Sequence, residues 1–136
     1  MDQAVIQNIR DSFDKQALMA TFQARMTRIE EGEVEICAPI LPLATQQHGF
    51  AHAGMTFAIG DSAAGYAALT MMPKGQDVLT TEMKINLMRP AGGDMLRAVG
   101  TVLKAGRLLT VVEAKVYADG KLCAALQGTM IGAPKG

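Results

Sequence analysis

The sequence has no Trp, few other aromatic residues and only two cysteines. Aromatic residues make up 4% of the chain, so the stacking platforms of single-stranded nucleic-acid binders are not expected. Its 13 basic and 13 acidic residues balance, which leaves no basic excess for a nucleic-acid footprint. Cys37 and Cys123 lie far apart without Cys-x-x-Cys spacing, which argues against a zinc site or a disulfide framework and fits a reducing compartment.

Targeting and membrane signals are also missing from the chain. The N-terminus lacks the basic-then-apolar pattern of a signal peptide. The segment 55–72 is long enough to span a bilayer, but its Ala, Gly and Ser content and its central Asp61 argue against lipid exposure. With 136 residues, 49% of them hydrophobic, we expect one cytosolic globular domain over residues 1–136.

One acidic side chain stands alone in a long uncharged stretch. Between Ile36 and Pro73, Asp61 is the only Asp, Glu, Lys or Arg. The residues around it are apolar on nearly every side of a helix, and a carboxylate in a buried helix is costly unless it is paired or used. A purely structural role is the alternative for Asp61, but buried acidic residues are rare and usually functional.

Hydrophobic spacing and turn residues indicate the order of the elements. They predict a helix over 3–15, a strand hairpin from Met19 to Ile36 that turns at Glu31-Gly32, a loop over 38–51, a helix over 53–72, and strands over 80–87, 95–104, 107–117 and 122–131. Consecutive hairpins favour an antiparallel sheet, and a helix that is apolar all round implies a sheet that wraps it. We therefore expect an α+β fold.

The long helix is rich in Ala and Gly, which let a sheet approach its backbone closely. Gly60 and Gly65 each cost about 1 kcal/mol of helix propensity relative to Ala. Tight packing is the expected compensation.

The residues before this helix match a family pattern. Gln46, His48, Gly49, His52 and Gly54 fall on the frame Asn-x-His-Gly-x-x-His-Gly-Gly, and Asp61 falls on the acid nine residues after the second His. With a Pro-Ala pair at 90–91 and a Gly-Arg turn at 106–107, the chain resembles the PaaI-like acyl-CoA thioesterases of the hotdog fold over about residues 20–132. Two positions depart from the frame, since Gln46 replaces Asn and Ala53 replaces the middle Gly.

The resemblance implies a six-stranded antiparallel sheet around one long helix. It also implies thioester hydrolysis with coenzyme A as part of the substrate, no separate cofactor or metal, and a dimer, often a dimer of dimers. Related enzymes carry a Ser or Thr that hydrogen-bonds the water or acid at the position of Thr80. Strand alternation, however, places Thr81 on the apolar side and Thr80 on the other.

Thioester hydrolysis requires oxyanion stabilisation and a base or nucleophile. The N–H groups of Ala53 and Gly54 at the helix start are candidates for an oxyanion hole. Gln46 and His52 are candidates for positioning the substrate or the attacking water; the alternative for His52 is a helix-capping or core role. Asp61 is the candidate general base, or the nucleophile through an anhydride, and the sequence leaves both roles open.

The spacing of two candidates has a geometric consequence. His52 and Asp61 are nine residues apart, which is roughly 13 Å of rise along one helix. They cannot meet within one chain. We therefore expect the site to form between two chains, with the helix start of one facing the acid of the other.

Five residues are candidates for contacting the coenzyme A portion of the substrate: His48, Gly49, Arg89, Lys104 and Arg107. The alternatives are a structural role for His48 and Gly49 in the loop and ordinary solvated turn charges for the three cations. Since the predicted slot has no charge besides Asp61, it favours apolar or aryl acyl groups. Two other functions stay open, namely a non-catalytic acyl-CoA binding module and a hotdog dehydratase or hydratase, although the His/Asp spacing of the latter is not found.

Overall fold

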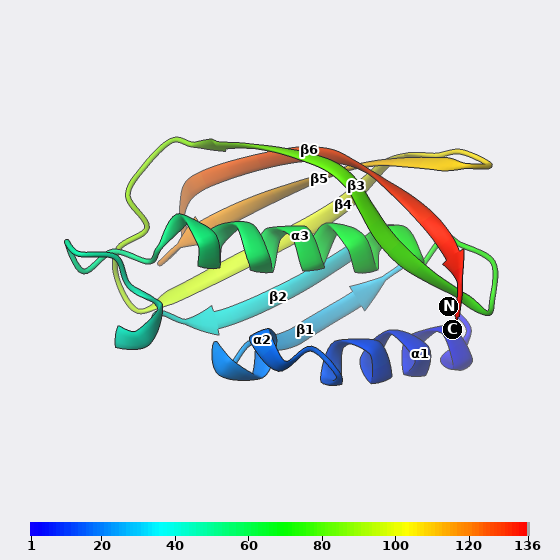
Figure 1. Ribbon diagram of the computed structural model, residues 1–136, viewed down its shortest axis with the longest axis horizontal. Helices are drawn as coiled ribbons and strands as arrows, with labels where there is room; N and C mark the ends of the chain where they lie inside the picture. The colour runs from blue at the N-terminus through cyan, green and yellow to red at the C-terminus, as the bar shows by residue number, and fades with distance from the viewer. Residues whose placement is uncertain (136) are drawn as a thin grey trace.

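The computed structural model describes residues 1–135 and shows one sheet curled around a central helix (Figure 1). The chain contains, in order, α1 (Gln3–Asp14), α2 (Ala17–Thr21), β1 (Arg25–Glu30), β2 (Glu33–Pro39), the short 3₁₀ helix η1 (Pro42–Ala44), α3 (Ala53–Leu69), β3 (Gln76–Leu87), β4 (Met95–Ala105), β5 (Leu109–Ala118) and β6 (Lys121–Pro134). All strand pairs are antiparallel, in the order β1-β2-β4-β5-β6-β3. This is the hotdog architecture expected from the sequence.

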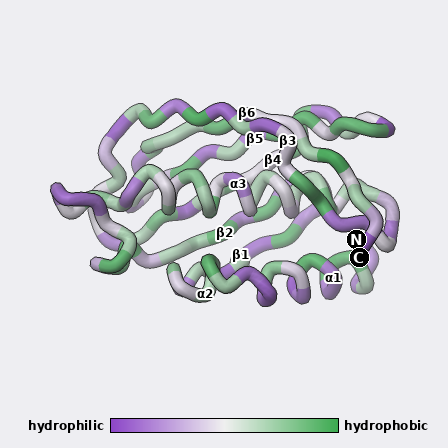
Figure 2. Tube along the Cα trace, in the orientation of Figure 1, coloured by the Kyte–Doolittle hydropathy of each residue, from purple (hydrophilic) through white to green (hydrophobic). Residues whose placement is uncertain are grey.

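Alternating side chains of the strands build the core against α3, and the alternation along the strands is visible in Figure 2. Val34, Ile36 and Ala38 of β2 are fully buried on the helix side of the sheet. The closest approach is at Gly100 of β4, where a Cβ atom would lie 2.3 Å from the backbone carbon of Ala63. The expectation that small residues bring the sheet close to the helix is confirmed.

The N-terminal helices cover part of α3. Asp2 caps α1 by accepting from Ala4 N at 2.8 Å. Phe13 packs edge-on against Tyr66 of α3, with ring centroids 6.1 Å apart. The Tyr66 hydroxyl lies 3.0 Å from the Ser12 hydroxyl and accepts from Gln16 Nε2 at 2.8 Å. These contacts fix α1 and its link to α2 against the second half of α3.

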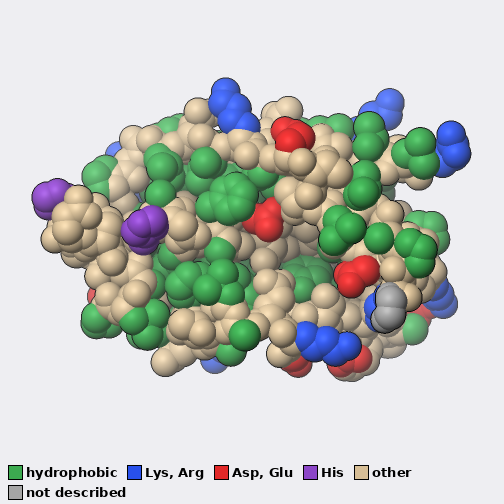
Figure 3. All heavy atoms as spheres, in the orientation of Figure 1, with side chains coloured by type: hydrophobic (Ala, Val, Ile, Leu, Met, Phe, Trp, Pro, Cys, Tyr) green, Lys and Arg blue, Asp and Glu red, His purple; other side chains and the backbone are tan. Residues whose placement is uncertain are grey.

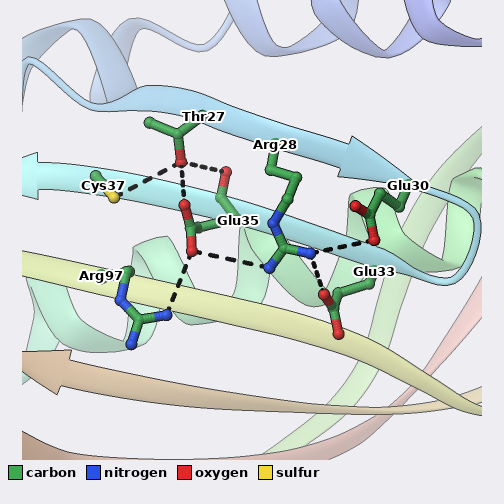
Figure 4. Close-up of polar contacts among 7 residues, drawn as sticks. All are labelled: Thr27, Arg28, Glu30, Glu33, Glu35, Cys37 and Arg97. Atoms are coloured by element: carbon green, nitrogen blue, oxygen red, sulfur yellow. Dashed lines mark hydrogen bonds and ion pairs between the residues drawn. The ribbon is translucent and has the colours of Figure 1, made fainter. Parts of the chain in front are cut away.

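The opposite face of the sheet carries charge instead of apolar side chains. Arg28 pairs with Glu30, Glu33 and Glu35, and Arg97 pairs with Glu35 at 3.3 Å. A hydrogen bond from Thr27 is the largest cause that lowers the pKa of Glu35. Figure 4 shows that this network belongs to β1, β2 and β4, and it takes no part in either of the cavities described below.

Several predicted boundaries are wrong, three of them at the helices and at the start of β3. The segment 19–21 is helical rather than extended, because Met19 and Phe22 bury their side chains at helical spacing. The helix predicted to reach Met72 ends at Leu69, because Thr70 donates to Ala67 O at 2.6 Å and accepts from Gly32 N at 2.8 Å. The strand predicted to begin at Thr80 begins at Gln76.

The helix α3 is not wrapped on all sides, contrary to the expectation from its apolar composition. The sheet covers one side and α1 and α2 cover another (Figure 1). A stripe along α3 remains exposed or half-buried, and its residues are Ala53, Gly54, Phe57, Ala58, Asp61 and Ser62. Within residues 1–135, no helix is both long and apolar enough to cross a membrane.

Candidate active site

The start of α3 is capped by its own histidine. His52 has extended backbone angles (φ −61°, ψ 142°), and its Nδ1 accepts from Gly54 N at 2.8 Å. The N–H of Gly54 is therefore occupied, which corrects the expectation that both N–H groups at the helix start are open. The N–H of Ala53 has no hydrogen-bond partner among residues 1–135.

The cap also fixes the hydrogen on the imidazole ring of His52. Because Nδ1 accepts a hydrogen bond, the neutral ring carries its proton on Nε2. The side chain is exposed and lines the largest cavity. His52 thus presents an N–H donor beside the open N–H of Ala53.

The loop before α3 is shaped by Gln46. Its Oε1 accepts from His48 N at 2.6 Å and from Phe50 N at 3.3 Å, and its own N donates to Phe50 O at 2.8 Å. Two backbone donors identify this side-chain atom as the oxygen. The Nε2 of Gln46 has no partner in the described part of the chain, so it is available to a ligand. Gly49 has a positive φ of 85°, which a residue with a Cβ rarely adopts.

The largest cavity has a volume of about 610 Å³ and lies at the start of α3. We call it the helix-start cavity, and it is lined by five of the predicted residues: Gln46, His48, His52, Ala53 and Arg89. Exposed Leu87 and Met88, from the end of β3, form an apolar wall. Lys104 and Arg107 do not line it, because they lie on the β4–β5 hairpin at the opposite end of the molecule (Figure 1).

Asp61 lies in a second cavity, the Asp61 cavity, with a volume of about 240 Å³. Thr80 Oγ1 donates to Asp61 Oδ1 at 2.7 Å. Burial raises the pKa of Asp61, and the hydrogen bond from Thr80 partly opposes this effect. Ser12, Gln16 and Tyr66 supply further polar groups to the same cavity.

The side of β3 on which Thr80 lies was predicted wrongly. The β3–β6 register shifts between Thr80 and Glu82, which is a β-bulge. The extra residue, Thr81, turns outward and donates to Thr129 O at 3.0 Å. Thr80 consequently faces α3 and reaches Asp61.

The two cavities share no lining residue. Within one chain, Asp61 and Thr80 are therefore separated from Gln46, His52 and Ala53. Figure 3 shows the two His side chains together at one end of the molecule and an acidic group recessed in the middle of the same face, beside apolar side chains. This separation agrees with the distance expected from nine residues of helix.

Sequence reasoning missed two residues in the helix-start cavity. Thr56 and Cys123 line it, and each is only 1% exposed. Thr56 was detectable as the first polar side chain within an apolar helix, whereas Cys123 reaches the cavity only through the pairing of β6 with β3. Among residues 1–135, no group of three or more His, Cys, Asp or Glu is placed to hold a metal ion.

Comparison with known proteins identifies the family. The sequence profile of the Thioesterase superfamily matches residues 48–125, which is more than half of the chain. A thioesterase family protein from Silicibacter pomeroyi has a solved structure with 41% identity and a TM-score of 0.93, covering 96% of this chain and 99% of its own.

Two further solved structures are similar to this chain. A protein from Bacillus halodurans, crystallised with CoA, is 29% identical with a TM-score of 0.79, covering 96% of this chain and 89% of its own. The PaaI protein of E. coli, from the phenylacetic acid degradation operon, shares the fold with a TM-score of 0.85 at 21% identity, covering 97% of this chain and 94% of its own. The expected PaaI-like hotdog fold is confirmed.

Proposed function

Because the chain belongs to the thioesterase superfamily, whose profile matches residues 48–125, we propose that it hydrolyses the thioester of an acyl-CoA at a site shared by two copies of the chain. One copy supplies the helix start with Gln46, His52 and Ala53. The other supplies Asp61 with Thr80. The products are the free acid and coenzyme A.

The observation that carries this proposal is the open N–H of Ala53. It is the first residue of α3, where the positive end of the helix dipole lies, and it faces the helix-start cavity. Backbone N–H groups at a helix start stabilise the negative oxygen that develops when a thioester is attacked. Gln46 Nε2 and His52 Nε2–H are further donors on the same rim.

Two uncovered surfaces support a second copy of the chain. The exposed stripe of α3 contains Phe57 and Ala58, and the neighbouring strand β3 is an edge strand of 12 residues. Leu79 and Leu87 on β3 are 54% and 55% exposed. The outer edge of β3 has no partner strand in the described chain, so its free backbone groups invite antiparallel pairing with an identical strand, which a two-fold axis satisfies. The family resemblance implies that two such dimers often join as a dimer of dimers.

The carboxylate of Asp61 has two possible roles at this site. As a base, it takes a proton from a water whose oxygen bonds to the acyl carbon, while the C–S bond breaks and the thiolate leaves. As a nucleophile, a carboxylate oxygen bonds to the acyl carbon and displaces the thiolate, and water then cleaves the anhydride. In both, the thiolate takes up a proton.

The lining of the helix-start cavity supports an acyl-CoA with an apolar or aryl acyl group. Leu87, Met88 and Phe50 supply apolar walls, and Arg89 is an exposed cation suited to phosphate. The CoA in the structure of the Bacillus halodurans protein supports the same ligand class.

The replacement of Gly by Ala at residue 53 does not favour the alternative of a non-catalytic binding module. Ala53 is not among the residues with positive φ, so its Cβ causes no backbone strain. Its N–H is retained. The departure from the family pattern therefore leaves the oxyanion donor in place.

A mixed dimer tests both the chemistry and the sharing of the site. Ala53→Pro removes the N–H, and Pro is favoured at the first helical position. The preceding His52 already has the extended conformation that a residue before Pro prefers. Ala53→Gly, which keeps the N–H, is the matched control. Asp61→Asn removes the charge of the acid.

Each variant alone should release little thiol from acyl-CoA. Co-expression with two different affinity tags isolates the dimer that contains one chain of each variant. In a shared site, one of its two sites has both native groups, so about half of the wild-type turnover returns. An inactive mixed dimer would show that both groups act within one chain. Absence of thiol release by the wild-type protein from all acyl-CoAs of graded length would reject thioester hydrolysis.

A further inference from the structure

The inner end of the helix-start cavity carries a polar group that the proposed hydrolysis does not use. Thr56 lines this cavity and is 1% exposed, whereas the rim residues His48, Leu87 and Arg89 are exposed. Thr56 lies three residues after Ala53, on the same side of α3. Its side chain therefore lies about one helical turn deeper than the N–H that would hold the thioester oxygen.

The hydroxyl of Thr56 opens into the cavity. It makes no hydrogen bond within residues 1–135, although Thr21 and Thr70 bond backbone carbonyls three or four residues earlier. In the same part of the chain, no side-chain oxygen or nitrogen is sealed from solvent without a partner. A hydroxyl that has no partner and is not sealed, on a residue that lines this cavity, is open to a ligand in the cavity.

The orientation of a bound thioester follows from its two arms. The CoA arm is long and anionic, so it leaves through the solvent-exposed rim beside Arg89. The acyl arm then points inward, past Ala53 toward Thr56. Three residues of helix rise about 4.5 Å, which is the length of about three covalent bonds. An atom attached near the third acyl carbon lies level with the Thr56 hydroxyl.

We propose, on the basis of the proposed thioester hydrolysis, that Thr56 is a specificity-determining residue that selects acyl groups carrying an oxygen at the third carbon, such as 3-hydroxyacyl-CoA. A hydroxyl both donates and accepts, so it pairs with a 3-hydroxyl or a 3-oxo group. An unsubstituted chain places a CH₂ against it and leaves it without a partner, which disfavours that substrate. The other buried residues that line the cavity, Ala51, Ala91 and Cys123, are apolar, which suits the hydrocarbon part of the same acyl group.

The test compares 3-hydroxybutyryl-CoA with butyryl-CoA as a ratio of kcat/KM. Thr56→Val keeps the shape and branching of the side chain and removes only the hydroxyl. We expect wild-type protein to prefer the hydroxylated substrate and Thr56→Val to lower the ratio about tenfold. Thr56→Ser, which restores a hydroxyl, should recover the preference. Thr101 lies on the face of β4 that points away from α3, so Thr101→Val is the control and should leave the ratio unchanged.

Binding measurements separate this proposal from the hydrolysis itself. Calorimetry on Asp61→Asn protein gives the ratio of Kd values for the same two CoA thioesters without turnover, with and without Thr56→Val. The same preference in binding supports the role of Thr56 even if wild-type protein hydrolyses neither compound. Equal kcat/KM and equal Kd for the two compounds in wild-type protein, or an equal loss for both in Thr56→Val, would overturn it.

Discussion

Thr80 Oγ1 donates a hydrogen bond of 2.7 Å to Asp61 Oδ1 and so joins edge strand β3 to the central helix. The β-bulge between Thr80 and Glu82 makes this contact possible, because it turns Thr80 toward α3 and places Thr81 outside. Thr80 thereby fixes the orientation of the one acid in the otherwise uncharged centre of the chain.

Thr80→Val should lower turnover about tenfold, because the carboxylate loses the hydrogen bond that orients it. The same bond lowers the pKa of Asp61, so its loss should raise that pKa further. The acidic limb of the kcat/KM profile should then move to higher pH. Thr80→Ser keeps the donor and should keep the wild-type profile, and an unmoved limb in Thr80→Val would show that the bond does not act on the reacting group.

Asp61→Asn should reduce turnover by about 10² to 10⁴-fold, the range of general acid–base catalysis. Because Asn Oδ1 still accepts from Thr80, the fold should be retained, as near-identical circular dichroism spectra would verify. Turnover close to that of the wild type would remove Asp61 from the mechanism.

The same variant should be more stable than wild type at neutral pH. Burial raises the pKa of Asp61 in the folded state above the unfolded value of about 3.9, so the ionised form destabilises the fold at pH values above the folded-state pKa. Below about pH 3.9, Asp61 is protonated in both the folded and the unfolded protein, and the difference in stability between the variant and the wild type disappears. Urea unfolding of both proteins at pH 7 and in acid measures this difference. If the variant is still more stable than the wild type in acid, the ionisation of Asp61 is not the cause.

Arg89→Ala should raise KM for acyl-CoA about three- to fivefold, as expected for an exposed cation facing phosphate. The N-acetylcysteamine thioester of the same acyl group lacks those phosphates, so its KM should not change. Lys115→Ala changes an exposed cation on the face of β5 that points away from α3, where it lines neither cavity, and is the control. An equal rise in KM for both thioesters would show that Arg89 acts on the cavity and not on the phosphates.

The overall arrangement of helix and sheet was predictable because several independent features of the sequence indicate it. The lone acid, the His and Gly residues before α3 and the hairpin turns each indicate the same helix and sheet. The central position of α3 followed from its apolar composition, and the separation of His52 from Asp61 followed from the rise of a helix.

The errors arise where one residue changes the register or ends an element. No local pattern marks the bulge at Thr81, since its cause is the pairing of β3 with β6. The end of α3 depends on a contact between Thr70 and Gly32, which are 38 residues apart. The capping of the Gly54 N–H by the His52 side chain was an alternative that the sequence left open, because it depends on a side-chain torsion that composition does not encode.

Gly65→Ala should stabilise the protein by about 0.5–1 kcal/mol, because it removes the conformational freedom of Gly from a helix interior. A Cβ at Gly65 would meet Met130 and Val78 at 3.8 Å, which is ordinary contact. The expectation that tight packing compensates for this Gly is therefore not met in the described chain. A loss of stability in thermal unfolding would show that a neighbour outside this chain fills the space.

Gly100→Ala should destabilise the protein by about 3 kcal/mol or more, because the added Cβ would lie 2.3 Å from the backbone of Ala63. Backbone atoms of α3 cannot move aside as a flexible side chain does, so the whole helix would shift from β4. Gly60→Ala is the informative comparison, since its Cβ would meet only side chains, Leu126 at 3.0 Å and Val116 at 3.4 Å, and we expect a smaller loss. Urea denaturation of the two variants measures the difference. Equal stabilities would mean that α3 and β4 are not in the close contact described here.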